Sequence, residues 1–278
     1  MKGKIIKNIS NDYTVDIDGI QYICKPRGKF RNENITPLVG DIVTIDEDNN
    51  YILSIEKRKN ELIRPSIANI DIAVIVTSVI DPDFDTYLLD KNLTIISFNN
   101  IEPIIYFTKL DLLNKEELEN INTIIKYYKS VGYKVATTTD ELMELIKNKT
   151  VVFTGQSGAG KSTLLNKINP KLSLKTDEIS KYLGRGKHTT RHTELYDINN
   201  TFIADTPGFS KIDFNGMTPI EIRDNMKEMF DNLKDCKYDD CMHISEDGCQ
   251  IIKMVNDNKI LQSRYKNYKS FINRWLYD

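Results

Sequence analysis

The pattern of hydrophobic and polar positions divides the chain into three regions. In residues 1–66, short runs alternate between apolar and polar side chains, and turn residues such as Asp18-Gly19 and Val39-Gly40 separate them. Short strands at this spacing, without helical periodicity, indicate a small antiparallel barrel, and at this size an OB-type barrel is the natural candidate. The strands that we predict here cover residues 13–17, 20–24, 41–45 and 51–55.

In residues 67–213, strand patterns alternate with helix patterns. The run Asp71 to Thr77 is typical of a buried parallel strand, and Lys115 to Ser130 has the periodicity of an amphipathic helix. The segment Glu194 to Asp205 fits a hairpin that turns at Asn199-Asn200. This alternation predicts an α/β doubly wound sheet, which binds ligands at the carboxyl ends of its strands. Further strands are predicted at residues 103–107, 135–139 and 151–153.

From residue 214 the pattern is helical, with a polar interruption between Lys234 and Gly248. The last stretch, Ile251 to Tyr277, predicts helix. Packing of its aromatic side chains onto the preceding domain is the simpler interpretation, and RNA contact is the alternative. The aromatic and basic residues concerned are Arg264, Tyr265, Lys266, Tyr268, Lys269 and Trp275. We therefore predict a multidomain protein with domains at 1–66, 67–213 and 214–278.

The composition is consistent with a folded protein of more than one domain. The chain has 278 residues, of which 40% are hydrophobic, so ordinary cores are expected. The formal net charge of −2 predicts no global attraction to nucleic acid, so any RNA surface must be a local patch. No apolar run is long enough to span a membrane, and the N-terminus lacks the apolar core of a signal peptide. We therefore expect a cytoplasmic protein, with no membrane partner, that acts as a monomer.

One local basic segment is a candidate for RNA binding. Lys25 to Arg31 places several basic residues and Phe30 between two predicted strands. Such a segment forms either a phosphate-contacting loop whose ring stacks on a base, or an ordinary solvated basic loop. The residues alone do not separate these two interpretations.

A complete phosphate-binding motif follows the predicted strand at 151–153. Residues Gly155 to Ser162 spell G-Q-S-G-A-G-K-S, and a helix-forming stretch begins at Thr163. In this strand–turn–helix context the backbone N–H groups of the turn surround a phosphate, Lys161 reaches the terminal phosphates, and the Ser162 hydroxyl ligates Mg²⁺. The motif predicts a nucleoside triphosphate site formed by Gly155, Gln156, Ser157, Gly158, Ala159, Gly160, Lys161, Ser162 and Thr163.

A second motif, upstream of the first, is typical of guanine selection. Thr108-Lys109-Leu110-Asp111 follows the predicted strand at 103–107 and matches a T/N-K-x-D turn. The Asp111 carboxylate would accept hydrogen bonds from the guanine N1–H and exocyclic amine, whereas adenine offers no matching donor pair. The tetrapeptide alone is also common in surface turns. Together with a phosphate loop, it predicts a GTP site to which Thr108, Lys109 and Asp111 contribute.

The order of the motifs predicts a permuted chain. Asp205-Thr206-Pro207-Gly208 matches the D-x-x-G element, in which Asp205 holds Mg²⁺ through water and the Gly208 amide senses the γ-phosphate. In most GTPases the guanine motif follows both other motifs, but here it precedes the phosphate loop. A sheet can be cut at one connection and rejoined at another, because domain termini often lie close together. We therefore predict a circularly permuted P-loop GTPase domain.

Three of the four cysteines cluster with a histidine near the C-terminus. Cys236, Cys241, His243 and Cys249 have the spacing C-x4-C-x-H-x5-C. Three thiolates and an imidazole suit tetrahedral Zn²⁺ and leave no open position for chemistry. The alternatives are a disulfide, which a reducing cytosol disfavours, or unrelated cysteines. We predict one structural zinc site in a helical C-terminal domain, and for Cys24 the role of a small buried hydrophobic residue.

The N-terminal barrel, the permuted GTPase domain with G-Q-S-G-x-G-K-S and the Cys-Cys-His-Cys segment together resemble the ribosome small-subunit-dependent GTPase A family. The resemblance covers essentially the whole chain, and Leu183 to Thr190 resembles the first switch of that family. It implies a late maturation factor of the small ribosomal subunit, which binds the subunit in its GTP state, is stimulated by it and leaves after hydrolysis. It also implies that the barrel and the zinc domain contact rRNA.

The resemblance also suggests roles in the two switches. Thr190, or its neighbour Thr189, would complete the Mg²⁺ shell with Ser162. Phe209 stands where many GTPases have a glutamine that orients the attacking water, so intrinsic hydrolysis should be slow. His192 is a hypothesis for the missing group, and a solvated switch residue is the alternative. The predicted catalytic residues are Lys161, Thr190, His192 and Gly208.

Two further expectations concern neighbouring segments. The guanine-backing S-A-x motif of the family is not clear here, and Ala136 to Thr139 lies where it should be. The second switch, Asp205 to Ser210, continues within a few residues into the zinc domain. We therefore hypothesise that a γ-phosphate that orders Gly208 repositions that domain directly.

Two other functional classes compete with this interpretation. A metabolic P-loop enzyme such as a kinase would use ATP and would not need Asp111. A non-catalytic RNA-binding module would keep GTP only as a structural ligand, and the intact Lys161, Ser162 and Asp205 argue against it. A nucleotide-competition assay between ATP and GTP distinguishes the first class from a GTPase. A multiple-turnover assay with a ribosomal partner distinguishes the second class from an enzyme.

Overall fold

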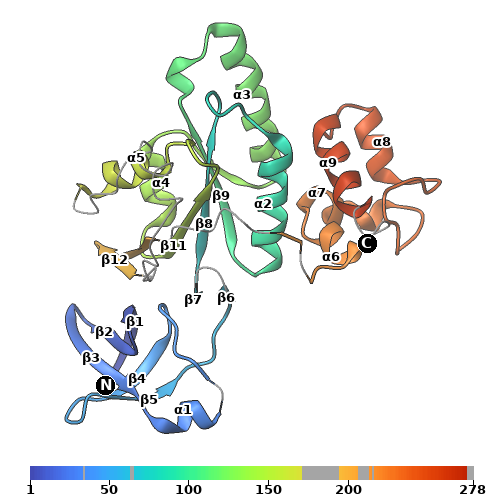
Figure 1. Cartoon of the computed structure of the whole chain (residues 1–278). Coiled ribbons are helices and arrows are strands. Elements are labelled where there is room, and N and C mark those ends of the chain that lie inside the picture. Colours follow the sequence, from blue (N-terminus) through green and yellow to red (C-terminus); the bar gives the residue numbers. More distant parts are fainter. Residues whose placement is uncertain (34, 63–65, 171–193, 206–212, 215, 274–278) are drawn as a thin grey trace, which may run out of the picture.

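The computed structural model describes residues 1–273 apart from positions 34, 63–65, 171–193, 206–212 and 215. Its N-terminal part is a closed five-stranded barrel (Figure 1). The strands follow the order β1-β2-β3-β5-β4, and β1 pairs again with β4, as in an OB-type barrel. Their bounds are β1 Lys2–Ile9, β2 Asp12–Ile17, β3 Ile20–Pro26, β4 Ile42–Asp46 and β5 Tyr51–Ile55.

Two features of the barrel differ from the prediction. The barrel is not wholly antiparallel, because β5 returns parallel to β3 after the chain has passed through α1 (Gly28–Asn32) and β4. The sequence also does not predict β1, since its side chains do not alternate strictly. A bulge between Ile5 and Lys7 interrupts the β1–β2 register, and both Ile5 and Ile6 are buried.

The predicted RNA loop from Lys25 to Arg31 is a strand end followed by the short helix α1. Phe30 is 4% exposed and belongs to the same hydrophobic cluster as Val15. Of the two interpretations of this segment, the one in which the ring stacks on a base is contradicted, because the helix turns this side chain into the core. Cys24 is fully buried, as predicted.

The central part is the predicted doubly wound sheet, with the strand order β10-β9-β8-β11-β13-β12. Helices α2 and α3 cover one face and α4 and α5 the other (Figure 1). All neighbours are parallel except β12 and β13. The strands are β8 Ile72–Ser78, β9 Glu102–Thr108, β10 Lys134–Ala136, β11 Thr150–Gly155, β12 Glu194–Ile198 and β13 Thr201–Asp205, and the helices are α2 Thr86–Phe98, α3 Lys115–Ser130, α4 Thr139–Ile146 and α5 Lys161–Ile168.

Local sequence signals explain most of these elements. The helix α3 has the predicted bounds, and the β12–β13 hairpin turns at Asn199 and Asn200, whose φ angles of 53° and 64° suit Asn in a tight turn. The strand predicted at 135–139 is wrong in its second half. The hydroxyl of Thr138 accepts a hydrogen bond from the backbone N–H of Glu141 at 3.2 Å and so begins α4.

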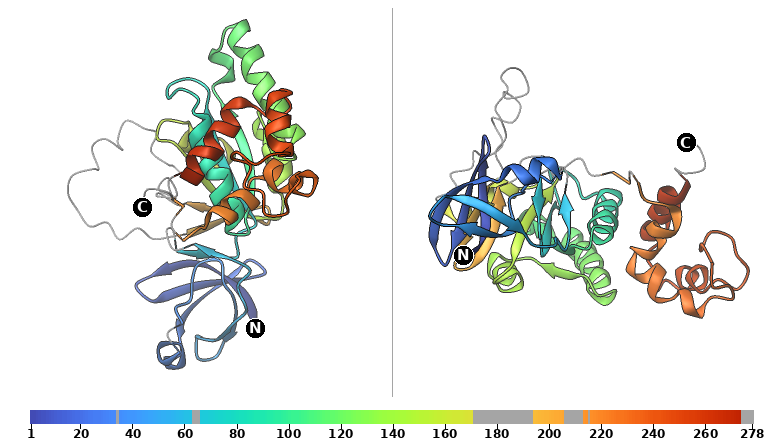
Figure 2. Two further views of the ribbon diagram at one scale, coloured as in Figure 1. Left: turned by 90° about the vertical axis from the view of Figure 1, so that its right-hand side faces the viewer. Right: turned by 90° about the horizontal axis from the view of Figure 1, so that it is seen from below.

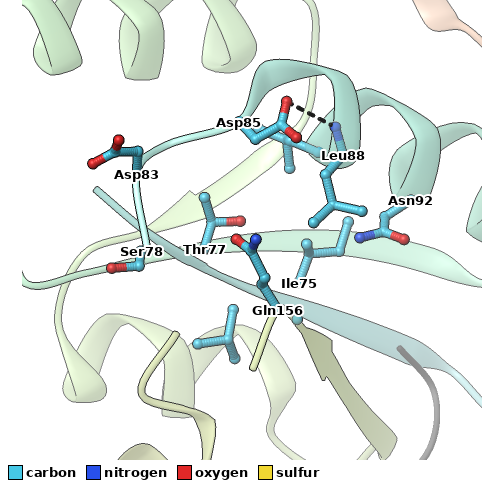
Figure 3. A pocket seen from close by; sticks show the side chains of 11 residues that line it. Ile75, Thr77, Ser78, Asp83, Asp85, Leu88, Asn92 and Gln156 are labelled. Carbon is cyan, nitrogen blue, oxygen red and sulfur yellow. Dashed lines mark hydrogen bonds between the residues drawn. The ribbon is translucent and has the colours of Figure 1, made fainter. Parts of the chain in front are cut away.

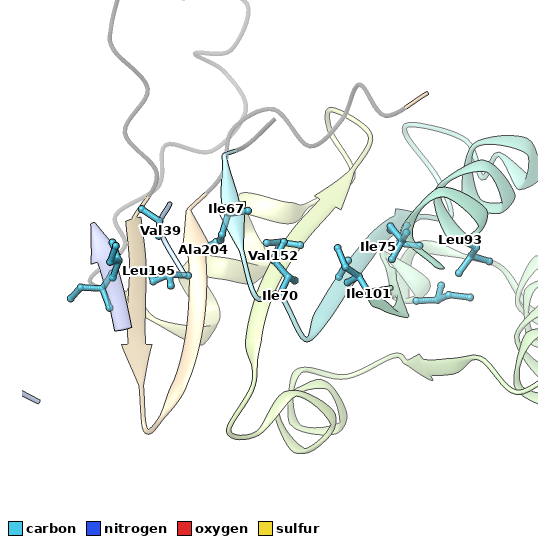
Figure 4. Close-up of a cluster of buried hydrophobic side chains, with 14 of the residues drawn as sticks. Val39, Ile67, Ile70, Ile75, Leu93, Ile101, Val152, Leu195 and Ala204 are labelled. Carbon is cyan, nitrogen blue, oxygen red and sulfur yellow. The ribbon is translucent and has the colours of Figure 1, made fainter. Parts of the chain in front are cut away.

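The barrel and the central sheet are hydrogen-bonded to each other, because β1 of the barrel pairs with β12 of the central sheet. Lys7 of β1 pairs with Glu194 of β12, and their side chains form an ion pair at 2.9 Å. The Lys4 ammonium reaches Thr150 Oγ1 at 2.9 Å. Apolar side chains continue from this junction to α2 (Figure 4). A small second sheet, β6 Glu61–Leu62 with β7 Ile67–Ala68, connects the two parts.

The C-terminal part is helical and lies beside α2 (Figure 2). The final stretch forms two helices separated by a turn in which Asn258 has a φ angle of 56°. Tyr265 and Tyr268 are buried, and the Phe271 ring lies 5.0 Å from that of Tyr87 in α2, in agreement with the packing interpretation. Trp275 lies outside the described residues. The helices are α6 Pro219–Asp224, α7 Lys227–Asp231, η3 Leu233–Asp235, α8 Gln250–Asn256 and α9 Gln262–Asn273.

No helix in the described part of the chain combines the length and apolarity needed to cross a membrane.

Candidate functional site

The phosphate-binding motif has the expected strand–turn–helix form. The fully buried strand β11 ends at Gly155, and α5 begins at Lys161. Gly155, Gly158 and Gly160 have φ angles of 152°, 82° and 87°, a region that glycine adopts far more readily than other residues. No side chain caps the N-terminus of α5, and its first turn carries no acidic residue. The N–H groups of this helix end therefore suit an anion such as a phosphate.

The guanine motif lies beside the phosphate loop, although the two are far apart in the chain. Strand β8 is parallel to both β9 and β11, so β9 and β11 end at the same edge of the sheet. The Thr108 hydroxyl donates a hydrogen bond to the Ala159 carbonyl at 2.8 Å. A Cβ built on Gly160 would lie 3.7 Å from the Thr108 side chain. Thr108 thus contacts the phosphate loop.

The two other residues of the guanine motif have different surroundings. Lys109 has a left-handed backbone with a φ of 62°, and its ammonium donates to the carbonyl of Asp81. Asp111 lies in the short helix η1 (Leu110–Leu112), and it is exposed. An exposed carboxylate at the carboxyl edge of the sheet is accessible to a base.

The D-x-x-G motif is only partly within the described residues. Asp205 ends β13, which is parallel to β11, so its backbone reaches the same edge of the sheet. The remaining switch residues predicted from the sequence lie outside the described residues; these are Thr189, Thr190, His192, Gly208 and Phe209.

The segment Ala136 to Thr139 leads from β10 into α4 and forms hydrogen bonds at the N-terminus of that helix. The backbone N–H and hydroxyl of Thr137 both donate to the Glu141 carboxylate, at 2.8 and 3.2 Å. Ala136 is fully buried in the core.

A small hollow adjoins the start of the phosphate loop (Figure 3). Apolar residues of β8 and α2 form part of its wall, and Asn92 and Gln156 contribute amides. The carboxylates of Asp83 and Asp85 also line it, and Asp85 caps the N-terminus of α2. The sequence analysis did not identify this hollow, because Asn92 and Asp85 match no motif.

The four predicted zinc ligands come together in the C-terminal part. Their ligand atoms all lie within 4.8 Å of one another. Cys236 Sγ and Cys249 Sγ lie 3.6 and 3.4 Å from His243 Nδ1. The opposite ring nitrogen, Nε2, lies 3.1 Å from the Met229 carbonyl. A proton on Nε2 would donate to this carbonyl, which leaves Nδ1 to face the sulfur atoms.

The protonation chemistry of this cluster fits a soft divalent cation. Burial raises the pKa of the Cys241 thiol to about 12 and lowers the pKa of His243. A lowered pKa favours the neutral imidazole that a metal ligand must be, whereas a thiolate needs a bound cation to offset its burial. The three cysteines are free of disulfides, although they lie close together. These observations favour the metal site over the disulfide alternative.

Hydrogen bonds hold the turn that carries these ligands. The Glu246 carboxylate accepts from the backbone N–H groups of Met242, Ile244 and Ser245 at 2.7, 2.7 and 2.9 Å. The Tyr265 hydroxyl donates to the His243 carbonyl at 2.8 Å. The turn is therefore fixed by its own carboxylate and by α9.

Comparison with known proteins agrees with this architecture. The family models described as RsgA N-terminal domain and RsgA GTPase match residues 2–52 and 55–215. A small ribosomal subunit biogenesis GTPase RsgA 2 of Oceanobacillus iheyensis is 46% identical over 98% of this chain and 96% of its own length. The corresponding RsgA of Enterococcus faecalis is 45% identical, with 98% and 94% covered.

Two solved structures are similar over almost their whole length. YjeQ from Thermotoga maritima has a TM-score of 0.86 at 32% identity, and the match covers 100% of this chain and 99% of the other. YloQ, described as a circularly permuted GTPase, has a TM-score of 0.83 at 36% identity, with 98% and 94% covered. The order of motifs, the fold and these similarities agree: the chain is a circularly permuted GTPase and belongs to the RsgA family.

Proposed function

We propose that this protein hydrolyses GTP at the edge formed by β9, β11 and β13, as a maturation factor that acts on the small ribosomal subunit. The observation that carries the proposal is the 2.8 Å hydrogen bond from Thr108 to Ala159. This contact joins the predicted base-binding turn to the predicted phosphate loop. A nucleotide that occupies one is therefore within reach of the other.

Each predicted residue has a defined part in this proposal. The phosphate-loop amides and Lys161 would bind the phosphates, Ser162 directly and Asp205 through a water would hold Mg²⁺, and Asp111 would bind guanine. Thr190 closes the Mg²⁺ shell and the Gly208 amide contacts the γ-phosphate in the GTP state. The Mg²⁺ that these residues would hold with GTP would offset the negative charge that develops on the phosphates during hydrolysis.

Hydrolysis by the free protein is expected to be slow. Phe209 stands where other GTPases orient the attacking water with a glutamine, and a phenyl ring cannot accept or donate the required hydrogen bonds. His192 is our candidate for the missing group. In this proposal the subunit positions that group, so that binding stimulates hydrolysis and hydrolysis releases the protein.

The proposed partner is the small ribosomal subunit and its rRNA. The relatives are named as small ribosomal subunit biogenesis GTPases, which supports the assignment. In the barrel, the exposed Lys25 and Lys29 offer charge for phosphates, and the exposed Ile23 and Tyr51 offer apolar contacts. We assign RNA contact to residues 1–66, catalysis to 67–213, and a zinc-stabilised second contact to 214–278, within a monomer.

The decisive experiment measures phosphate release from GTP with and without purified small subunits, with ATP and large subunits as controls. We expect stimulation of about tenfold or more, confined to GTP and small subunits. Stimulation by large but not small subunits, or turnover of ATP as fast as that of GTP, would contradict the proposal. The ATP arm also tests the alternative of a metabolic kinase.

A matched variant tests the base assignment. In Asp111→Asn, the amide oxygen can still accept from the guanine N1–H, but the new N–H faces the exocyclic amine, so one hydrogen bond becomes a repulsion between two donors. GTP affinity should fall about 100-fold, whereas xanthosine triphosphate, which has a carbonyl in place of the exocyclic amine, should bind better than to the parent. Equal loss for both nucleotides would contradict the role of Asp111.

A further inference from the structure

A fully buried ionic cluster joins the C-terminal helices to α2. Arg264 of α9 is 0% exposed, as is Asp90 of α2, and Glu228 of α7 is 2% exposed. The guanidinium donates to Asp90 at 2.6 Å and to the two Glu228 oxygens at 2.6 and 3.0 Å. Three tyrosine hydroxyls and one amide complete it: Tyr127, Tyr128, Tyr133 and Asn267.

This cluster has two properties that matter for motion. Every charge in it is desolvated, so pulling one helix away would leave a carboxylate or the guanidinium without a partner in an apolar surrounding. Its members also come from both sides, since Asp90 and the tyrosines belong to the central part and Arg264 and Glu228 to the C-terminal part. Helices α2 and α9 are therefore held as one unit and do not slide gradually.

The N-terminal end of α2 lies at the nucleotide motifs. Asp85 caps this helix, and Asp90 is five residues further on, about 7 Å along the helix axis. The loop before the cap contacts both motifs: the Asp81 carbonyl accepts from the Lys109 ammonium, and a Cβ on Gly158 would lie 3.4 Å from Pro82. This loop also lines the hollow that Gln156 borders (Figure 3).

The C-terminal end of the connection reaches the cysteine–histidine cluster. Met229, which follows Glu228 in α7, lies with its carbonyl 3.1 Å from His243 Nε2. Tyr265, which follows Arg264 in α9, donates to the His243 carbonyl at 2.8 Å. The residues that follow Glu228 and Arg264 in the chain therefore both contact His243.

We propose that α2, locked to α9 by Arg264, mechanically couples the loop Asp81 to Asp85 beside the phosphate loop to the C-terminal cysteine–histidine unit. A nucleotide that tightens the Asp81 to Asp85 loop then stabilises the C-terminal unit, and the C-terminal unit favours nucleotide binding to the same extent. This route uses none of the second-switch residues 206–212. Its nucleotide arm rests on the proposed function, because it requires GTP or GDP at the phosphate loop.

The test compares two arginines that each bind a buried carboxylate. Arg264→Met keeps an unbranched side chain of similar length but removes the ionic cluster. Arg58→Met is the matched control, since Arg58 also binds a buried carboxylate in a bidentate way, Asp41 at 2.7 and 2.8 Å, but lies away from α2. Amide hydrogen exchange is followed in residues 81–88, first without nucleotide and then with GDP, and GDP dissociation is measured with a fluorescent analogue.

In Arg264→Met we expect exchange in residues 81–88 to rise at least about fivefold and GDP dissociation to accelerate by a similar factor. In Arg58→Met both should stay within about twofold of the parent. Unchanged exchange in residues 81–88 of nucleotide-free Arg264→Met would overturn the coupling. If Arg264→Met does not fold, Asp90→Asn, which keeps the side-chain volume, replaces it under the same criteria. Failure of the parent to bind GDP would count against the proposed function, and the nucleotide-free exchange would still decide the coupling.

Discussion

In the phosphate loop, we expect a glycine-to-alanine substitution to reduce stability by different amounts at two positions that are three residues apart. Gly155 and Gly158 both have positive φ angles, 152° and 82°. An alanine at either position is strained by about 1–2 kcal/mol, because its Cβ crowds the backbone. The surroundings differ. A Cβ at Gly158 would meet only Pro82 Cδ at 3.4 Å, whereas at Gly155 it would lie 2.3 Å from the Val76 carbonyl oxygen.

The additional cost at Gly155 follows from what must move. Val76 lies in β8, directly paired with Gly155 of β11, so relief of the clash separates two central strands. Overpacking of this kind adds about 1–3 kcal/mol, which gives a total of about 2–5 kcal/mol for Gly155→Ala against about 1–2 kcal/mol for Gly158→Ala.

Urea unfolding of both variants, followed by far-UV circular dichroism, measures this difference. We expect the midpoint of Gly155→Ala to fall well below that of Gly158→Ala, with unchanged slopes. Nucleotide affinity should fall in both, since both distort the loop, so affinity alone does not distinguish them. Equal loss of stability in the two variants would refute the argument that the β8 backbone imposes glycine at position 155.

Two further predictions concern charge and metal. Burial raises the pKa of Asp71, but its ion pair with Lys59 and the N–H of Thr150 at 2.7 Å outweigh burial and hold the pKa below its ordinary value. Asp71→Asn should therefore lower the free energy of unfolding by about 1–2 kcal/mol at pH 7. The difference in urea midpoint between the parent and the variant should vanish as the pH falls through the lowered pKa of Asp71. A difference that stays constant down to pH 2 would contradict this prediction. Removal of metal by a chelator, or Cys249→Ser, should release amide protection in residues 236–256 while β8 and β11 keep theirs, and unchanged exchange would contradict a structural metal.

The parts of the fold that depend on local patterns were predictable from the sequence. The α3 helix has an Asn114–Glu117 capping box before an amphipathic run, so residues close in sequence determine where it begins and which face it buries. The hairpin at Asn199-Asn200 and the cysteine–histidine cluster also follow from short segments. The juxtaposition of the motifs was predictable for another reason, since each follows a buried strand and such strands of a parallel sheet end at one edge.

The parts that depend on contacts between distant segments were not predictable in this way. Arg264 lies in a stretch of aromatic and basic residues for which RNA contact was an alternative, but Asp90, 174 positions away in the chain, binds it inside the protein. Stacking of Phe30 on a base was one of two open interpretations, because basic residues flank it in the sequence. Only the path of α1 across the barrel determines that this ring points inward. The parallel β3–β5 pair likewise depends on barrel closure, which no local pattern encodes.

The permutation has a consequence for how the accessory parts attach to the site. In the sheet, β11 lies between β8 and β13. The barrel leads through β6 and β7 into β8, and the chain after β13 continues to the C-terminal helices. Both accessory parts are therefore connected to the two direct neighbours of the phosphate-loop strand, each about 4.8 Å from it. The altered chain order therefore attaches the barrel and the C-terminal helices one strand away from β11, so a displacement of β11 on nucleotide binding would act on both attachments.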